Sequence, residues 1–110
     1  METTTAVAAL GALAQTTRLE AFRLLVRAEP AGLPAGEVAR LLEIPQNTGS
    51  SHLSILSNAG LVMSQREGRS VVYRADLDAF RELTLFLLKD CCNGRADLCA
   101  PLIAELSPCC

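Results

Sequence analysis

Five cysteines, all between positions 91 and 110, are the residues of this 110-residue chain with the clearest potential for chemistry. Cys91 and Cys92 are adjacent, Cys99 follows after a segment whose Asn-Gly-Arg can turn the chain back, and Cys109 and Cys110 end the sequence. Thiolates are soft ligands, and a set of ligands made only of sulfur favours a soft, thiophilic ion. The spacing therefore predicts that Cys91, Cys92 and Cys99 converge on one small ion.

The number of thiols bears on the identity of that ion. Trivalent arsenic and antimony bind three thiolates in a pyramid, whereas zinc prefers a tetrahedron of four ligands, usually from C-x₂₋₄-C pairs. Cys109 or Cys110 could add a fourth ligand, so zinc, cadmium and lead stay open. A reversible oxidation of the thiols is a further alternative. We expect arsenite as the ligand, with antimony as a related one and no organic cofactor.

A thiol-dependent enzyme is a separate class of function. Its reactive cysteine would need a low pKa in a pocket with a nearby base. The single histidine, His52, lies far from the cysteines in the sequence, and no glycine-rich loop for a phosphate is present. The sequence therefore predicts a protein that is not an enzyme.

Length and composition indicate one folded domain, residues 1–110, whose last part is a cysteine-rich tail (91–110). Half of the residues are apolar, and the net charge is −2. The start METTTAVAALGALAQ lacks the cationic region of a signal peptide, and no run approaches the ~18 apolar residues that span a bilayer. We expect a cytoplasmic protein without a membrane partner. Thiols stay mostly reduced there, which favours metal binding or redox sensing over structural disulfides.

Two helices are expected before position 30. Their apolar positions at helical spacing are Val7, Leu10 and Leu13 in the first and Leu19, Phe22, Leu25 and Val26 in the second. Thr17 and Glu20 fit a capping box at the start of the second helix. The segment EPAGLP then predicts its end.

The middle of the chain has the pattern of a helix-turn-helix. A short helix, GEVARLLE, should turn Val38, Leu41 and Leu42 inward. After Ile44-Pro45, the segment QNTGSSHLSILSNAG has Leu53 and Leu56 on one face, and Gly60 is suited to end the helix with a positive φ.

The periodicity then changes to two residues. LVMSQREGRSVVYRA alternates on both sides of Glu67-Gly68, which predicts a β-hairpin. A hairpin directly after a helix-turn-helix is the winged-helix arrangement. The expected fold is therefore mainly α with a small β-hairpin (α+β).

The last long helix, DLDAFRELTLFLLKD, should be capped by Asp76 and interrupted near Gly94, with a further short helix at ADLCAPLIAEL. Its apolar stripe is Leu77, Phe80, Leu83 and Leu87, and Leu85 and Phe86 fall outside that stripe. A helix that is apolar on more than one face is buried on two sides. We expect a second copy of the chain to cover one of them, forming a homodimer.

One face of the fourth expected helix is polar without being charged. Asn47, Ser50, Ser51, Ser54 and Asn58 follow one another at helical spacing, opposite the leucines. Such side chains can hydrogen-bond to base edges in the major groove. A solvated helix face is the alternative, but such a face usually carries Lys and Glu.

Residues 46–75 hold three arginines, at 66, 69 and 74, against one acid, so this half is locally basic. The residues that we predict to contact DNA are Gln46, Asn47, Ser50, Ser51, His52, Ser54, Arg66 and Arg69.

The stretch TTRLEAFRLLVRAEPAGLPAGEVARLLEIPQNTGSSHLSILSNAGLV, followed by SQREGRSVVYRAD, resembles the ArsR/SmtB family of winged-helix metal-sensing repressors. The resemblance covers about residues 6 to 92. It implies a homodimer joined through the first and last helices. It also implies binding of double-stranded operator DNA through the fourth helix and the wing, with Asn47, Ser50 and Ser51 at the groove-facing positions.

The sequence departs from the best-known arsenic repressors of that family, which carry an ELCVCDL-type motif in the first helix of the helix-turn-helix. The equivalent stretch here, AGEVARLLE, has no cysteine. Family members whose last helix ends in a Cys-Cys pair, with a third cysteine soon after, resemble arsenic sensors of a separately evolved type. The resemblance thus implies a repressor that leaves DNA when arsenite or antimonite binds Cys91, Cys92 and Cys99. The alternatives are a sensor of zinc, cadmium or lead and a thiol redox sensor.

Overall fold

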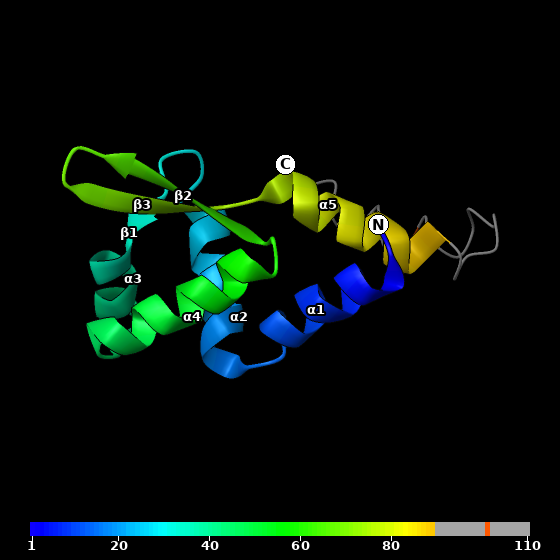
Figure 1. Ribbon diagram of the computed structural model, residues 1–110, viewed down its shortest axis with the longest axis horizontal. Helices are drawn as coiled ribbons and strands as arrows, with labels where there is room; N and C mark the ends of the chain where they lie inside the picture. Colours follow the sequence, from blue (N-terminus) through cyan, green and yellow to red (C-terminus); the bar gives the residue numbers. More distant parts are fainter. Residues whose placement is uncertain (90–100, 102–110) are drawn as a thin grey trace.

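The computed structural model describes residues 1–89 and 101, which form a helical body with a small sheet at one end (Figure 1). The helices are α1 (Thr3–Leu13), α2 (Thr16–Arg27), α3 (Ala35–Leu42), α4 (Gln46–Asn58) and α5 (Leu77–Lys89), and the strands are β1 (Leu33–Pro34), β2 (Val62–Glu67) and β3 (Ser70–Ala75). Helices α3 and α4 form the helix-turn-helix, and β2 and β3 form the wing. The predicted fold class is confirmed.

The sheet has three antiparallel strands in the order β1-β3-β2, one more than the predicted hairpin. The short strand β1 pairs Leu33 with Tyr73 and Pro34 with Val72. Gly32 precedes it with a φ of +76°, and a Cβ atom there would lie 2.6 Å from the carbonyl oxygen of Tyr73. Only glycine therefore lets the chain approach β3 this closely.

The core is aliphatic, as the low aromatic content requires. Its largest fully buried side chains are Leu25, Val38, Leu53, Leu56, Leu61 and Leu83. These come from α2, α3, α4, the turn before β2, and α5, and Ala6, Ala9 and Ala12 of α1 belong to the same cluster. Phe22 and Phe80 add one tilted aromatic pair at its edge, with ring centroids 5.3 Å apart.

Helix α1 packs on the body mainly through alanines, and of the predicted stripe Leu13 alone packs against the core. Its buried residues are Ala6, Ala9 and Ala12, whereas Val7 is 61% exposed and Leu10 is 40% exposed. Small side chains let α1 lie close to its neighbours, which leaves the larger apolar side chains on the outer face. Figure 1 shows α1 and α5 side by side, reaching away from the wing.

Helices α2 and α3 also expose part of their predicted apolar faces. The capping box is wrong, because α2 begins at Thr16 and the side chain of Gln15 accepts the hydrogen bond from the Arg18 N–H, at 2.8 Å. The predicted inward residues Leu19, Val26 and Leu41 are exposed, whereas the small residues Ala21 and Ala39 are buried.

The start of α5 is as predicted, and its predicted apolar stripe is divided between the core and the surface. The N–H of Ala79 donates to Asp76 Oδ1 at 3.1 Å, which confirms the cap. Leu83 is buried and Phe86 packs against the core, whereas Leu77, Phe80 and Leu87 are exposed. The predicted interruption near Gly94 and the further helix after it lie outside the described residues.

Candidate nucleic-acid interface

The position of α4 is set by its tight packing on α3. Leu53 and Leu56 are buried, as predicted. Gly49 is buried as well, and a Cβ atom there would lie 3.1 Å from the Cβ of Ala39. Gly60 takes a φ of +81° directly after the helix, which confirms the predicted end of α4. These contacts fix which face of α4 points outward.

The outward face of α4 carries hydrogen-bonding groups and no charge. Of the predicted DNA-contacting residues of this helix, Gln46, Asn47, Ser51 and Ser54 are exposed and Ser50 is half-buried. Thr48 and Ile55 are exposed as well, and the prediction missed both. Thr48 follows Asn47 directly and Ile55 follows Ser51 by one helical turn, so a helical wheel centred on the buried leucines would have found them.

His52 lies apart from the outward face. It is half-buried, and its Nδ1 is 3.4 Å from Nη1 of Arg18 at the start of α2. The sequence predicts a DNA contact for His52, whereas the structure gives its ring a partner within the protein.

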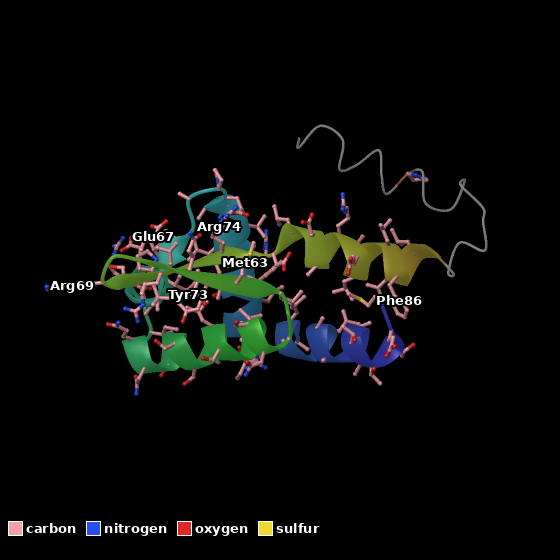
Figure 2. All side chains as sticks on the ribbon, turned by 45° about the horizontal axis from the view of Figure 1, so that its top comes forward. Met63, Glu67, Arg69, Tyr73, Arg74 and Phe86 are labelled. Atoms are coloured by element: carbon pink, nitrogen blue, oxygen red, sulfur yellow. The ribbon has the colours of Figure 1, made fainter. Side chains whose placement is uncertain are left out.

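The wing carries two exposed arginines. Arg66 in β2 and Arg69 in the turn between β2 and β3 are both exposed, and Figure 2 shows Arg69 at the tip of the wing. A hollow of about 300 Å³ lies between the wing, the start of α3 and Gln46 at the start of α4. Gln46, Arg69, Ser70 and Tyr73 are among the residues that line it. The structure thus brings the predicted residues Gln46 and Arg69 to the same corner of the molecule.

The third arginine of this region is already paired. Arg74 Nε donates to Glu29 Oε2 at 2.9 Å, and Nη2 donates to Glu29 Oε1 at 3.2 Å. These hydrogen bonds and the charge of Glu29 raise the pKa of Arg74. The prediction counted three arginines as the basic charge of this half, whereas Arg74 is paired with Glu29. In the part of the chain that the structure describes, Arg66 and Arg69 form no ion pair.

Comparison with known proteins agrees with this arrangement. A family model described as a helix-turn-helix domain matches residues 13–65. The homodimeric winged helix-turn-helix DNA-binding domain of a possible ArsR-family regulator from Mycobacterium bovis has a TM-score of 0.64 at 26% identity, over 81% of each chain. HlyU from Vibrio cholerae is 33% identical over 79% of this chain and 97% of its own, with a TM-score of 0.62. The chain belongs to the ArsR family of transcriptional regulators.

A curated relative that is also a transcriptional regulator matches about half of the chain. The uncharacterized HTH-type transcriptional regulator YbzH of Bacillus subtilis is 34% identical over 56 residues, which are 51% of this chain and 56% of that protein. The match thus spans little more than half of YbzH. The family relationship confirms that this chain is not an enzyme.

Two further predictions concern the cysteine site and the absence of a membrane span. Cys91, Cys92 and Cys99, the predicted ligands of arsenic, lie outside the described residues, so the three-thiol site remains a prediction. Within residues 1–89 and 101, no helix combines the length and the apolar character that crossing a membrane requires.

Proposed function

We propose that the protein is a homodimeric transcriptional repressor that binds operator DNA with α4 and the wing. The observation that carries this proposal is the exposed, uncharged face of α4, whose Gln46 lines the same hollow as Arg69 of the wing. Amide and hydroxyl groups on α4 would read base edges in the major groove, and the arginines would neutralise phosphates on either side of it.

The exposed apolar side chains of α1 and α5 support a dimer. Val7 and Leu10 on α1 and Phe80 and Leu87 on α5 are each exposed by 38% or more in the single chain, and the two helices lie side by side. Burial of apolar surface drives the association of protein subunits. A second copy placed on this surface by two-fold symmetry would give two recognition helices, which read half-sites about one turn of DNA apart.

The cysteine tail is the proposed ligand site. It follows α5 directly in the sequence, and α5 carries part of the proposed dimer surface. Arsenite bound to Cys91, Cys92 and Cys99 would alter the end of that helix and thereby the spacing of the two recognition helices. Linkage requires that arsenite release DNA only if it binds the free dimer more tightly than the DNA-bound dimer.

Native mass spectrometry of the reduced protein, alone and with arsenite, antimonite or zinc, tests the ligand. The expected spectrum is a dimer with one arsenic per subunit, absent in Cys92→Ser or Cys99→Ser and kept when Cys109 and Cys110 are both replaced by serine. Zinc bound with arsenic excluded would favour the sensor of zinc, cadmium or lead. A disulfide that forms readily with no ion bound would favour the redox sensor.

DNA binding is tested separately, with a duplex selected by the protein from a random pool. Fluorescence anisotropy should give one dimer per duplex, and Asn47→Ala and Ser51→Ala should each change which base is preferred at one position of each half-site. Recovery of no sequence preference from the pool would contradict the proposal.

A further inference from the structure

Arg18 contacts two other helices through one side chain. Its Nε donates to the carbonyl oxygen of Ala12 in α1 at 2.6 Å, and its Nη1 lies 3.4 Å from His52 Nδ1 in α4. Its own backbone N–H donates to the side chain of Gln15, the residue that caps α2. One half-buried guanidinium therefore joins the ends of α1 and α2 to the recognition helix.

The contact with α1 has a clear physical basis. The last carbonyl groups of a helix have no partner within it, and they form the negative end of its dipole, where a cation is favoured. Ala12 lies in that last turn of α1. Because α1 otherwise packs through the apolar side chains of Ala6, Ala9, Ala12 and Leu13, the hydrogen bond from Arg18 supplies a directional contact that these side chains lack.

The contact with α4 brings the guanidinium of Arg18 to a ring nitrogen of His52. Arginine has donors only, so a hydrogen bond across this contact has Arg18 Nη1 donating and His52 Nδ1 accepting. His52 stands between Ser51, which faces outward, and Leu53, which is buried. A turn of α4 about its own axis would therefore change the contact between Arg18 and His52 together with the direction of Ser51.

We propose that Arg18 is a positioning residue that fixes the recognition helix relative to α1, and so sets the half-site spacing that the dimer accepts. The inference rests on the proposed function, in which α1 helps to join the two copies and α4 enters the groove. The separation of two recognition helices in such a dimer depends on how α4 is held against α1 within each copy. Arg18 acts on DNA through His52 and α4.

Duplexes that carry two copies of the selected half-site, separated by the selected spacing or by one or two base pairs more or fewer, test this role. The wild type should prefer one spacing by about tenfold or more, since recognition helices bind half-sites at a fixed geometric separation. Arg18→Met should flatten this preference to a few-fold while the affinity for a single half-site stays unchanged. Arg18→Lys, which keeps the charge but cannot donate at both places, should behave like Arg18→Met.

His52 provides the second variant and a conservative rescue. His52→Leu removes the acceptor and should flatten the spacing preference, whereas His52→Asn offers Oδ1 near the place of Nδ1 and should restore it. Thermal unfolding and sedimentation of each variant establish that it is folded and dimeric.

The possible outcomes distinguish a failure of the positioning role of Arg18 from a failure of DNA binding itself. An unchanged spacing preference in Arg18→Met and His52→Leu would overturn the positioning role. An equal loss of affinity at every spacing, with a shallower dependence on salt, would also overturn it and would make Arg18 a phosphate contact. Failure of the wild type itself to bind any selected duplex would instead overturn the proposed function.

Discussion

The carboxylate of Glu29 and the guanidinium of Arg74 face each other with two hydrogen bonds, at 2.9 and 3.2 Å. Glu29 follows α2, and Arg74 is in β3, so the pair ties the base of the wing to the helical body. The side chain of Glu29 is only 16% exposed. The pair therefore holds the strand that presents Arg69 at the tip of the wing.

Removal of one partner of this pair should destabilise the protein. Arg74→Met leaves the carboxylate of Glu29 largely buried without a partner, so the midpoint of thermal unfolding should fall. In the double variant Arg74→Met with Glu29→Gln, the midpoint should fall by less than the sum of the two single decreases, because both substitutions remove the same interaction. Circular dichroism of the four proteins measures this.

The exposed pair between Arg40 and Glu37 on α3 is the matched control. Its arginine side chain is 67% exposed, and exposed pairs contribute little to stability. Arg40→Met should leave the midpoint almost unchanged. Equal losses in Arg40→Met and Arg74→Met would show that the pair at the base of the wing has no special role.

Two glycines should respond to alanine in opposite directions. Gly32→Ala forces a side chain into a left-handed conformation and against the Tyr73 carbonyl, so it should cost about 2 kcal/mol or more. Gly11→Ala, in α1 with nothing within 4 Å of the added Cβ, should stabilise the protein by up to about 1 kcal/mol. Denaturant unfolding at one fixed protein concentration gives both values, and stabilisation by Gly32→Ala would contradict the close approach of β1 to β3.

The recognition helix and the wing could be predicted because each has a strong local pattern. Leu53 and Leu56 define the inner face of α4, Gly60 ends it, and the alternation around Glu67-Gly68 defines the hairpin. The two-residue strand β1 could not be predicted, since two residues have no periodicity.

The remaining errors have two physical causes. The stripe predicted for α1 assumed that its largest apolar side chains point to the chain's own core, whereas α1 uses Ala6, Ala9 and Ala12 for close packing and leaves Val7 outside. The contacts of His52 and Arg74 join residues 34 and 45 positions away in the sequence, so no spacing rule reveals them. The cysteine site stays a prediction, because it lies beyond the described residues.

Arg69 should contribute to DNA affinity through charge alone. Neutralising one phosphate-binding cation makes the dependence of log K on log salt less steep by about 0.9, so Arg69→Ala should reduce the steepness by about 2 in a dimer and leave the preferred sequence unchanged. Arg81→Ala, which removes a 72% exposed arginine on α5, is the control and should leave the salt dependence as it is. A changed base preference in Arg69→Ala would mean that the wing reads bases.

A charge placed on the outer face of α1 should weaken the dimer. Val7→Glu and Leu10→Glu would each bury a carboxylate at the proposed interface, so the dissociation constant should rise by about tenfold or more, which corresponds to about 1.4 kcal/mol. Sedimentation over a range of concentrations measures it. Leu41→Glu, at a similarly exposed position on α3, should leave the dimer intact. If all three variants dimerise alike, α1 is not part of the interface.

Cys91→Ser should separate DNA binding from ligand response. The residue lies in the tail and far along the chain from α4, so the variant should bind the selected duplex as the wild type does. Arsenite should weaken the wild-type complex by about 5- to 150-fold, the range typical of coupled binding sites, and should have no effect on the Cys91→Ser complex. Anisotropy titrations with and without arsenite under reducing conditions measure both, and Cys109→Ser with Cys110→Ser serves as the control that still responds. Arsenite-driven release of the Cys91→Ser variant would move the ligand site elsewhere, whereas release of the wild type by an oxidant, with no response to arsenite, would favour the redox sensor.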